Sequence, residues 1–170
     1  VSYDSPADVA IRGQEDGIEK YVIKLLTGNS AKGVFYADSA CEAETVVKNL
    51  VKEFQLSSER FPQVEEYVRG EGWGVSVLYW HGKYIASFTH LRIREKIASG
   101  GTSTLRETAL NLAIEPAARS IFDSIGWHGL AMCEFKVCPE TGRFWFIEVN
   151  PRLWGSISLA VSAGVEFPYL

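Results

Sequence analysis

Cysteine is scarce in this 170-residue sequence, and its three cysteines are an odd number without CxxC spacing. This pattern indicates neither a disulfide framework nor a structural zinc site. No apolar run approaches the roughly 20 residues that cross a bilayer. The first residues also lack the basic-then-apolar pattern of a signal segment. We therefore expect a soluble, cytoplasmic protein that does not act at a membrane.

The sequence also lacks an excess of positive charge. Lys and Arg number 17 against 21 Asp and Glu, which gives a formal net charge of −4 and argues against general nucleic-acid binding. Hydrophobic residues make up 46% and charged residues 22%, a balance typical of a globular chain. A chain of this length builds one substantial core, so we expect a single domain.

Strand signals recur along the chain between helix signals. Ser39 with Glu42 forms a capping box, and apolar residues at helical spacing follow it as far as Phe54. Apolar or alternating runs predict strands at 21–26, 34–37, 63–68, 73–80, 84–92, 130–138 and 144–150. This order favours an α+β fold with mostly antiparallel sheets.

Two further helices are predicted in the second half of the chain. Thr104 with Glu107 matches a second capping box, which predicts a helix that runs towards Gly126 and is bent or broken at Pro116. The last helix is expected over 155–163, with Gly164 as its end.

The segment 129–152 is the most informative part of the sequence. A three-residue loop at 140–142 sets Glu134 opposite Glu148 on two paired strands, and the two-residue period places Asn150 on the same face. Two facing carboxylates repel each other, and a divalent cation between them removes that cost. Their oxygens and that of the Asn amide suit Mg²⁺ or Mn²⁺.

An alternative interpretation makes this hairpin face an ordinary solvent-exposed surface. In that case Lys136 and Arg152 neutralise the carboxylates. Pro151 favours the metal site, because it fixes the chain as the strand ends and allows Arg152 to turn back towards the anionic site.

Lys24 lies inside an apolar strand, where an ammonium is costly unless it meets an anion. The alternative is an edge strand from which the amine reaches water. The loop 28–33 that follows offers many backbone N–H groups to phosphate oxygens. It lacks the Lys-Ser/Thr of a P-loop and precedes a strand, which excludes that motif. A flap over phosphates and a plain hairpin turn both remain open.

A basic stretch contains Arg92, Arg94 and Lys96, close to the glycine pair Gly100 and Gly101. Such a stretch suits a triphosphate or an acyl phosphate, although a solvated charged loop is the more common explanation for the stretch taken alone. The three histidines are scattered: His81 is interpreted as a turn residue, and His90 and His128 as structural. Cys133 alternates away from Glu134 and is therefore expected in the core.

Together these motifs resemble the ATP-grasp superfamily of carboxylate–amine or carboxylate–thiol ligases, near the large subunit of carbamoyl-phosphate synthetase. The resemblance runs from about Tyr21 to the end of the chain. It rests on Lys24 before the glycine loop, on 64–71, on Glu134-Phe and on the block 146–152. It implies the ATP-grasp fold, with two α+β subdomains that enclose the nucleotide.

The resemblance also implies the domain plan. We expect a nucleotide-binding subdomain over 1–69 and a catalytic, metal-binding subdomain over 70–170. Family members carry a preceding domain and an earlier lysine, so the resemblance implies a truncated ATP-grasp domain. The oligomeric state stays open, although exposed apolar surface on a truncated domain favours self-association.

The roles of individual residues follow from the same resemblance. The implied ATP-binding residues are Lys24, Gly28, Ser30, Lys32, Gly33, Glu65, Glu66, Val68 and Glu71. The implied metal ligands are Glu134, Glu148 and Asn150, and the implied catalytic residues are Arg152, Arg94 and Lys96.

The implied activity is that of an ATP- and Mg²⁺-dependent ligase. ATP would activate a small-molecule carboxylate as an acyl phosphate, which an amine or another nucleophile captures. Two alternatives stay open: a nucleotide-binding or assembly module without catalysis, and a kinase-like phosphotransferase on the same scaffold. The sequence does not identify the carboxylate or the acceptor.

Overall fold

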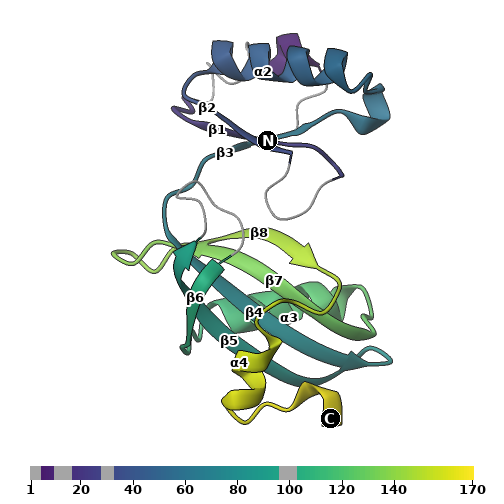
Figure 1. The fold of residues 1–170 in the computed structure, drawn as a ribbon, viewed down its shortest axis with the longest axis vertical. Coiled ribbons are helices and arrows are strands. Elements are labelled where there is room, and N and C mark those ends of the chain that lie inside the picture. The colour runs from purple at the N-terminus through teal and green to yellow at the C-terminus, as the bar shows by residue number, and fades with distance from the viewer. Residues whose placement is uncertain (1–4, 10–16, 28–32, 96–102) are drawn as a thin grey trace. The chain divides into compact units, whose positions relative to one another are not determined.

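Two separate antiparallel sheets organise the chain (Figure 1). The computed structural model describes residues 5–9, 17–27, 33–95 and 103–170. It divides into two compact units, Val1–Tyr67 (unit 1) and Val68–Leu170 (unit 2). The architecture confirms the predicted α+β fold with antiparallel sheets. Within the described residues, no helix is both long enough and apolar enough to span a membrane.

Unit 1 is a three-stranded sheet covered by one helix. The sheet has the order β2-β1-β3, with β1 Tyr21–Lys24, β2 Val34–Ala37 and β3 Gln63–Glu66. The helix α2 Ala40–Glu53 packs on β1 and β2, and the 3-10 helix η1 Ser58–Arg60 follows it.

The predicted cap of α2 is confirmed. Ser39 Oγ accepts a hydrogen bond from the Glu42 N–H at 3.2 Å, and the Glu42 carboxylate accepts one from the Asp38 N–H at 2.8 Å. The predicted apolar stripe forms the core of unit 1 with the inward residues of the sheet. Phe54, which was expected to end that stripe, is the C-cap residue and is exposed.

Unit 2 contains a five-stranded sheet with the order β6-β5-β4-β7-β8. Its strands are β4 Glu71–Trp80, β5 Lys83–Glu95, β6 Ser103–Thr108, β7 Gly129–Val137 and β8 Phe144–Asn150. Its helices are α3 Ile114–Ser124, α4 Ile157–Ser162 and the 3-10 helix η2 Phe167–Tyr169.

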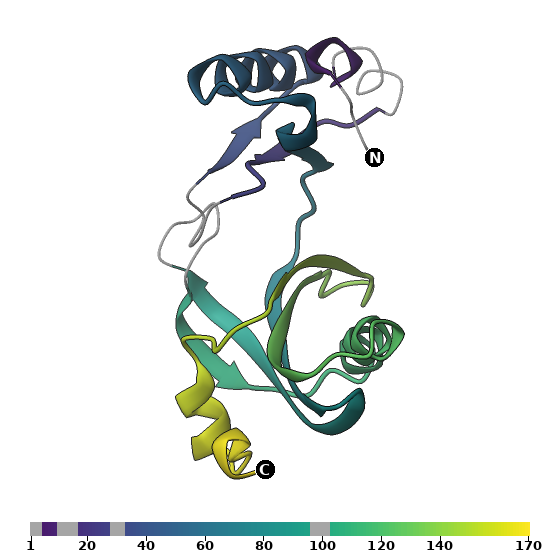
Figure 2. The same ribbon diagram turned by 90° about the vertical axis from the view of Figure 1, so that its right-hand side faces the viewer.

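The two faces of the unit 2 sheet are covered differently. The sheet curves around α3, which is seen end-on in Figure 2, and alternate residues of β4 such as Val75 and Val77 pack against Phe122 of α3. On the opposite face, the C-terminal segment with α4 and η2 packs over Phe88 and Met132. The rest of that second face carries polar residues, among them Arg92, Glu134 and Glu148, and we call it the polar face.

The predicted start of the helix at Thr104 is wrong, whereas its second half is confirmed as α3. Residues 103–108 form β6, which pairs with β5, and α3 begins only at Ile114. The capping-box pattern is a local signal, whereas hydrogen bonding to β5 satisfies the same backbone as a strand. Asn111 supports the start of α3, because its Oδ1 accepts from the Ala113 and Ile114 N–H groups. Pro116 lies in the first turn of α3, where its missing N–H costs nothing.

Candidate active site

A β-bulge sets the geometry of the β7–β8 hairpin. Glu134 lies opposite Glu148, which confirms the predicted pair. The loop is one residue longer than predicted, because Val137 pairs with Phe144 and Cys138 donates to the Arg143 carbonyl at 2.8 Å. The register then shifts between Glu134 and Phe135, which restores the predicted partner of Glu134. The pairing was thus predicted correctly through two errors that cancel.

The bulge also changes the face to which β8 side chains point. Phe146 contacts Phe135 on the α3 side, with ring centroids 6.0 Å apart. Two residues further on, Glu148 lies on the polar face with Glu134. In a regular strand these two β8 residues would share a face. The bulge is therefore what allows β8 to supply both an aromatic packing residue and a carboxylate.

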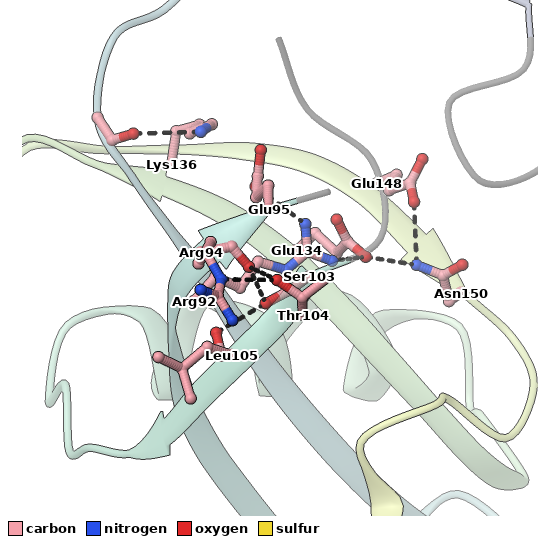
Figure 3. Close-up of polar contacts among 11 residues, drawn as sticks. Arg92, Arg94, Glu95, Ser103, Thr104, Leu105, Glu134, Lys136, Glu148 and Asn150 are labelled. Atoms are coloured by element: carbon pink, nitrogen blue, oxygen red, sulfur yellow. Dashed lines mark hydrogen bonds and ion pairs between the residues drawn. The ribbon is translucent and has the colours of Figure 1, made fainter. Parts of the chain in front are cut away.

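Asn150 joins the two carboxylates. Its Nδ2 donates to Glu134 Oε1 at 3.1 Å and to Glu148 Oε1 at 3.0 Å (Figure 3). Arg152 donates from Nη2 to Asn150 Oδ1 at 3.1 Å, so it reaches the carboxylates through the amide. Lys136, named in the alternative interpretation, donates instead to the Gly70 carbonyl. Among the described residues, no three His, Cys, Asp or Glu residues gather as metal ligands.

Arg92 is the cation that meets Glu134, and the sequence did not predict this contact. Its Nη2 lies 2.5 Å from Glu134 Oε1, and its Nη1 lies 3.5 Å from Glu95 Oε1. The side chains of Arg92 and Glu134 are only 12% and 15% exposed. Because β4 lies between β5 and β7, the Arg92 side chain has to cross a whole strand to reach Glu134.

Two glycines in β4 make that crossing feasible. Gly72 pairs with Arg92, and a Cβ on Gly72 would lie 3.0 Å from Arg92 Cδ. Gly74 pairs with His90, and a Cβ on Gly74 would lie 2.3 Å from His90 Cε1. Side chains of β5 thus occupy the space that β4 side chains would fill. The Gly-x-Gly pattern in this strand was the available sequence signal.

The charges of this cluster are not balanced. Burial raises the pKa of Glu134, Glu148 raises it further, and Arg92 acts in the opposite direction. Burial lowers the pKa of His90 to about 4, and Arg92 and Arg106 contribute to the same shift. His90 is therefore neutral at neutral pH. Added positive charge beside Glu134 and Glu148 would stabilise both carboxylates.

Glu71 and Arg94 line one depression on unit 2, with a volume of about 600 Å³. Arg92, Glu95 and Lys136 also line it. Arg94 donates from Nε to Thr104 Oγ1 at 3.1 Å, which ties β5 to β6. The structure therefore brings two predicted site residues together here.

Lys24 meets an anion in unit 1. Its Nζ lies 2.5 Å from Glu65 Oε2, with the two side chains 19% and 30% exposed. Because β1 is the central strand, the edge-strand alternative for Lys24 is wrong.

The other residues predicted to bind ATP lie in different places. Gly33 adopts a φ of 84° just before β2, and Glu66 ends β3. Val68 begins unit 2. The predicted residues Gly28, Ser30, Lys32 and Lys96 lie outside the described residues.

Cys133 is not a candidate nucleophile. It is fully buried in the α3-side core, as expected, and burial raises the pKa of its thiol to about 12.

Comparison with known proteins supports the same family. The family model described as the carbamoyl-phosphate synthase L chain, ATP binding domain, matches residues 83–166. The biotin carboxylase domain of 2-oxoglutarate carboxylase from Hydrogenobacter thermophilus has a similar fold over 98% of this chain, with a TM-score of 0.73 and 16% identity. The chain has the ATP-grasp fold. D-alanyl-alanine synthetase A from Vibrio cholerae shares the fold over 88% of the chain, with a TM-score of 0.65 and 19% identity.

The chain spans a small part of the proteins that it resembles. Acetyl-CoA carboxylase 2 of Oryza sativa subsp. japonica is 41% identical over 64 residues, which are 36% of this chain and 3% of that protein. The chain also spans 38% of the Hydrogenobacter structure and 47% of the Vibrio structure. The Hydrogenobacter domain was solved as a dimer with MgADP, ADP and bicarbonate.

Proposed function

We propose that this chain is the ATP- and Mg²⁺-binding part of a ligase or carboxylase that activates a carboxylate as an acyl phosphate. The observation that carries the proposal is the facing pair Glu134 and Glu148, bridged by Asn150, in a chain of the ATP-grasp superfamily. The MgADP bound to the Hydrogenobacter carboxylase domain supports the same cofactors here.

The donor set fits a hard divalent cation. Two carboxylates and an amide supply oxygen ligands, and Mg²⁺ completes its shell with water and phosphate oxygens. Burial and the neighbouring Glu148 raise the pKa of Glu134 against the opposing effect of Arg92, so a cation bound here would favour its charged form. Asn150 now directs its amide nitrogen at both carboxylates, so it would have to turn its amide to offer Oδ1. When bound, the cation would offset charge on the nucleotide phosphates.

The remaining predicted residues divide between the two units. In unit 1, Lys24 and the loop 28–33 would hold phosphates, and Glu65 and Glu66 would lie near the adenine. Because Lys24 is paired with Glu65, phosphate binding has to displace that carboxylate. We assign nucleotide binding to residues 1–69 and the metal and catalytic residues to 70–170.

Residues of unit 2 would act mainly by charge and position. Arg152, Arg94 and Lys96 would offset the charge of the phosphoryl group during transfer, and Val68 and Glu71 would contact the nucleoside. A carboxylate oxygen attacks the γ-phosphorus, the bond to the β-phosphate breaks and ADP leaves. An amine or another nucleophile then attacks the acyl carbon and releases phosphate. This chemistry needs no protein nucleophile, in keeping with the buried Cys133.

Two calorimetric titrations of the chain with ATP test this proposal, one with Mg²⁺ and one with a chelator in its place. The wild-type chain is expected to bind with Mg²⁺ and to lose most of its affinity in chelator. Glu148→Gln should abolish the metal dependence and leave the chain folded, with an equal or higher melting temperature. The matched control is Glu140→Gln, which removes the same charge from the exposed β7–β8 turn and should behave as wild type. Unchanged Mg-ATP affinity in a folded Glu148→Gln variant would contradict the metal assignment.

A product assay then separates the ligase from its alternatives. ADP and phosphate released only with both a carboxylate and an amine indicate a ligase. ADP with a stable phosphorylated acceptor indicates a kinase-like enzyme. Nucleotide binding without ADP formation from any tested carboxylate indicates a non-catalytic module.

A further inference from the structure

Arg106 lies directly across from another arginine. It is on β6, where it is the cross-strand partner of Arg92 on β5. Cross-strand partners share a face, so both guanidinium groups lie on the polar face with Glu134. Like charges placed directly opposite each other destabilise a sheet. The arrangement therefore needs something to compensate it.

Within the described part of the chain, Arg106 has no hydrogen bond or ion pair that provides this compensation. Arg92 is held by Glu134 and Glu95, whereas Arg106 has no such partner and is only partly exposed. Burial and the neighbouring Arg92 lower the pKa of Arg106, and Glu134 opposes this shift. Arg106 thus lies near the carboxylate cluster through its pairing with Arg92, and no ion pair among the described residues joins it to that cluster.

Further hydrogen-bonding atoms beside this arginine pair are also unsatisfied. Arg92 Nε and both ring nitrogens of His90 are buried without a hydrogen-bond partner among the described residues. His90 pairs with Thr108, two rows along the same β5–β6 ladder and therefore on the same face. Positive charge and unused N–H donors thus gather on one side of Glu134, a combination that fits a small anion.

We infer that Arg106, with Arg92 beside it, binds the carboxylate group of the substrate that this site activates. The inference deepens the proposed function and rests on it. A planar guanidinium offers two parallel N–H donors that match the two oxygens of a carboxylate. An anion at this place would also remove the repulsion between the two arginines. Arg106 therefore determines which class of substrate the site accepts and does not contribute to ATP affinity.

The test uses the full chain without nucleotide and ¹³C-labelled carboxylates as probes. Acetate, bicarbonate, glycine and succinate are titrated while their ¹³C line widths are followed. At least one probe should show saturable broadening with the wild-type chain. Arg106→Gln should weaken this binding at least tenfold. Arg106→Lys should bind the probe more tightly than Arg106→Gln but more weakly than wild type, because lysine keeps the charge but lacks the two parallel N–H donors.

Matched controls separate this role from a general effect of charge. Arg143→Gln removes the same charge from the exposed β7–β8 turn and should bind the probe as wild type does. Mg-ATP affinity of Arg106→Gln should stay within twofold of wild type. Its melting temperature should be equal or higher, because the substitution removes a repulsion.

Several outcomes would overturn the inference. They are the absence of saturable broadening with wild type, equal probe affinity in Arg106→Gln, and an equal loss of Mg-ATP affinity in that variant. Tighter Arg106-dependent binding of inorganic phosphate than of every carboxylate would also overturn it. Failure of the proposed function is seen separately, in wild-type calorimetry with Mg-ATP and no carboxylate present.

Discussion

The two units each hold a cation against a carboxylate, but they do so in different ways. In unit 1, Lys24 reaches Glu65 on the adjacent strand, and both side chains remain partly exposed. In unit 2, Arg92 crosses the whole of β4 to reach Glu134, and both side chains are almost buried. The first pair needs only neighbouring strands. The second needs Gly72 to leave room for a side chain from β5.

The two pairs also differ in charge balance. Lys24 and Glu65 form a one-to-one pair. The unit 2 cluster also contains Glu148 and Arg106. Burial and Glu148 raise the pKa of Glu134, whereas burial and Arg92 lower the pKa of Arg106, so neither Glu134 nor Arg106 has its charge fully neutralised. A balanced pair gains little from a further ion, whereas an unbalanced cluster is stabilised by one. This difference points to unit 2 as the part of the chain whose stability responds most to a metal ion or an anion.

Breaking each ion pair should have unequal costs. Arg92→Met leaves two carboxylates on the polar face without their main cation and should cost unit 2 roughly 3 to 5 kcal/mol of unfolding free energy. Lys24→Met should cost unit 1 about 1 kcal/mol or less, because its partner can be solvated.

Urea unfolding measures the two costs separately. All five tryptophans lie in unit 2, so tryptophan fluorescence follows that unit alone. Hydrogen exchange at the β1 amides follows unit 1. Equal costs for the two substitutions would show that burial does not distinguish the pairs.

Acid should also affect the two units differently, because all three histidines lie in unit 2. The pKa of His90 is lowered to about 4, so between pH 6.5 and 4 the unfolded chain binds a proton that the folded chain excludes. The free energy of unfolding of unit 2 should therefore fall as the pH drops through this range, by up to roughly 3 kcal/mol. His90→Gln should lack this part of the pH dependence.

The difference between wild type and His90→Gln removes the contribution of other titrating groups. His81→Asn is the control, since Asn tolerates the left-handed backbone that His81 adopts at a φ of 47°. A parallel pH dependence in wild type and His90→Gln would show that the imidazole is not buried in its neutral form.

A smaller loss is expected when space is removed from β4. Gly74→Ala places a Cβ 2.3 Å from His90 Cε1 and should cost unit 2 roughly 2 kcal/mol, because the ring has to move within a packed layer. Tryptophan fluorescence in urea measures this cost. The double variant Gly74→Ala, His90→Ala should lose less than the sum of its single changes.

Gly155→Ala serves as the control, since a Cβ at Gly155 meets nothing within 4 Å. Strictly additive effects of the changes at Gly74 and His90 would contradict direct contact between these residues.

Most of the fold could be predicted from local signals. The cap at Ser39 and the strand runs were enough to place α2 and seven strands, and the turn at Gly142 was located to within one residue. The one missed strand, β6, carries a capping-box pattern that its pairing with β5 overrides. A local capping pattern does not produce a helix where pairing with a distant strand satisfies the same backbone N–H and C=O groups.

The candidate site could also be predicted only where its residues are close together in the sequence. Glu134, Glu148 and Asn150 could be placed on one face because they belong to a single hairpin. The partners of Lys24 and Glu134 could not, because Glu65 and Arg92 lie about forty residues away along the chain.

By itself, the sequence determined which residues carry charge into the sheets, where the hairpin turns and where α2 begins. These features depend on residue types and on neighbours only a few positions apart. The tertiary structure alone decided which charges meet, that the β7–β8 hairpin contains a bulge, and that Arg106 is left opposite Arg92. The reason is that strand order and register are set by the burial of whole faces, which no single segment of this chain specifies.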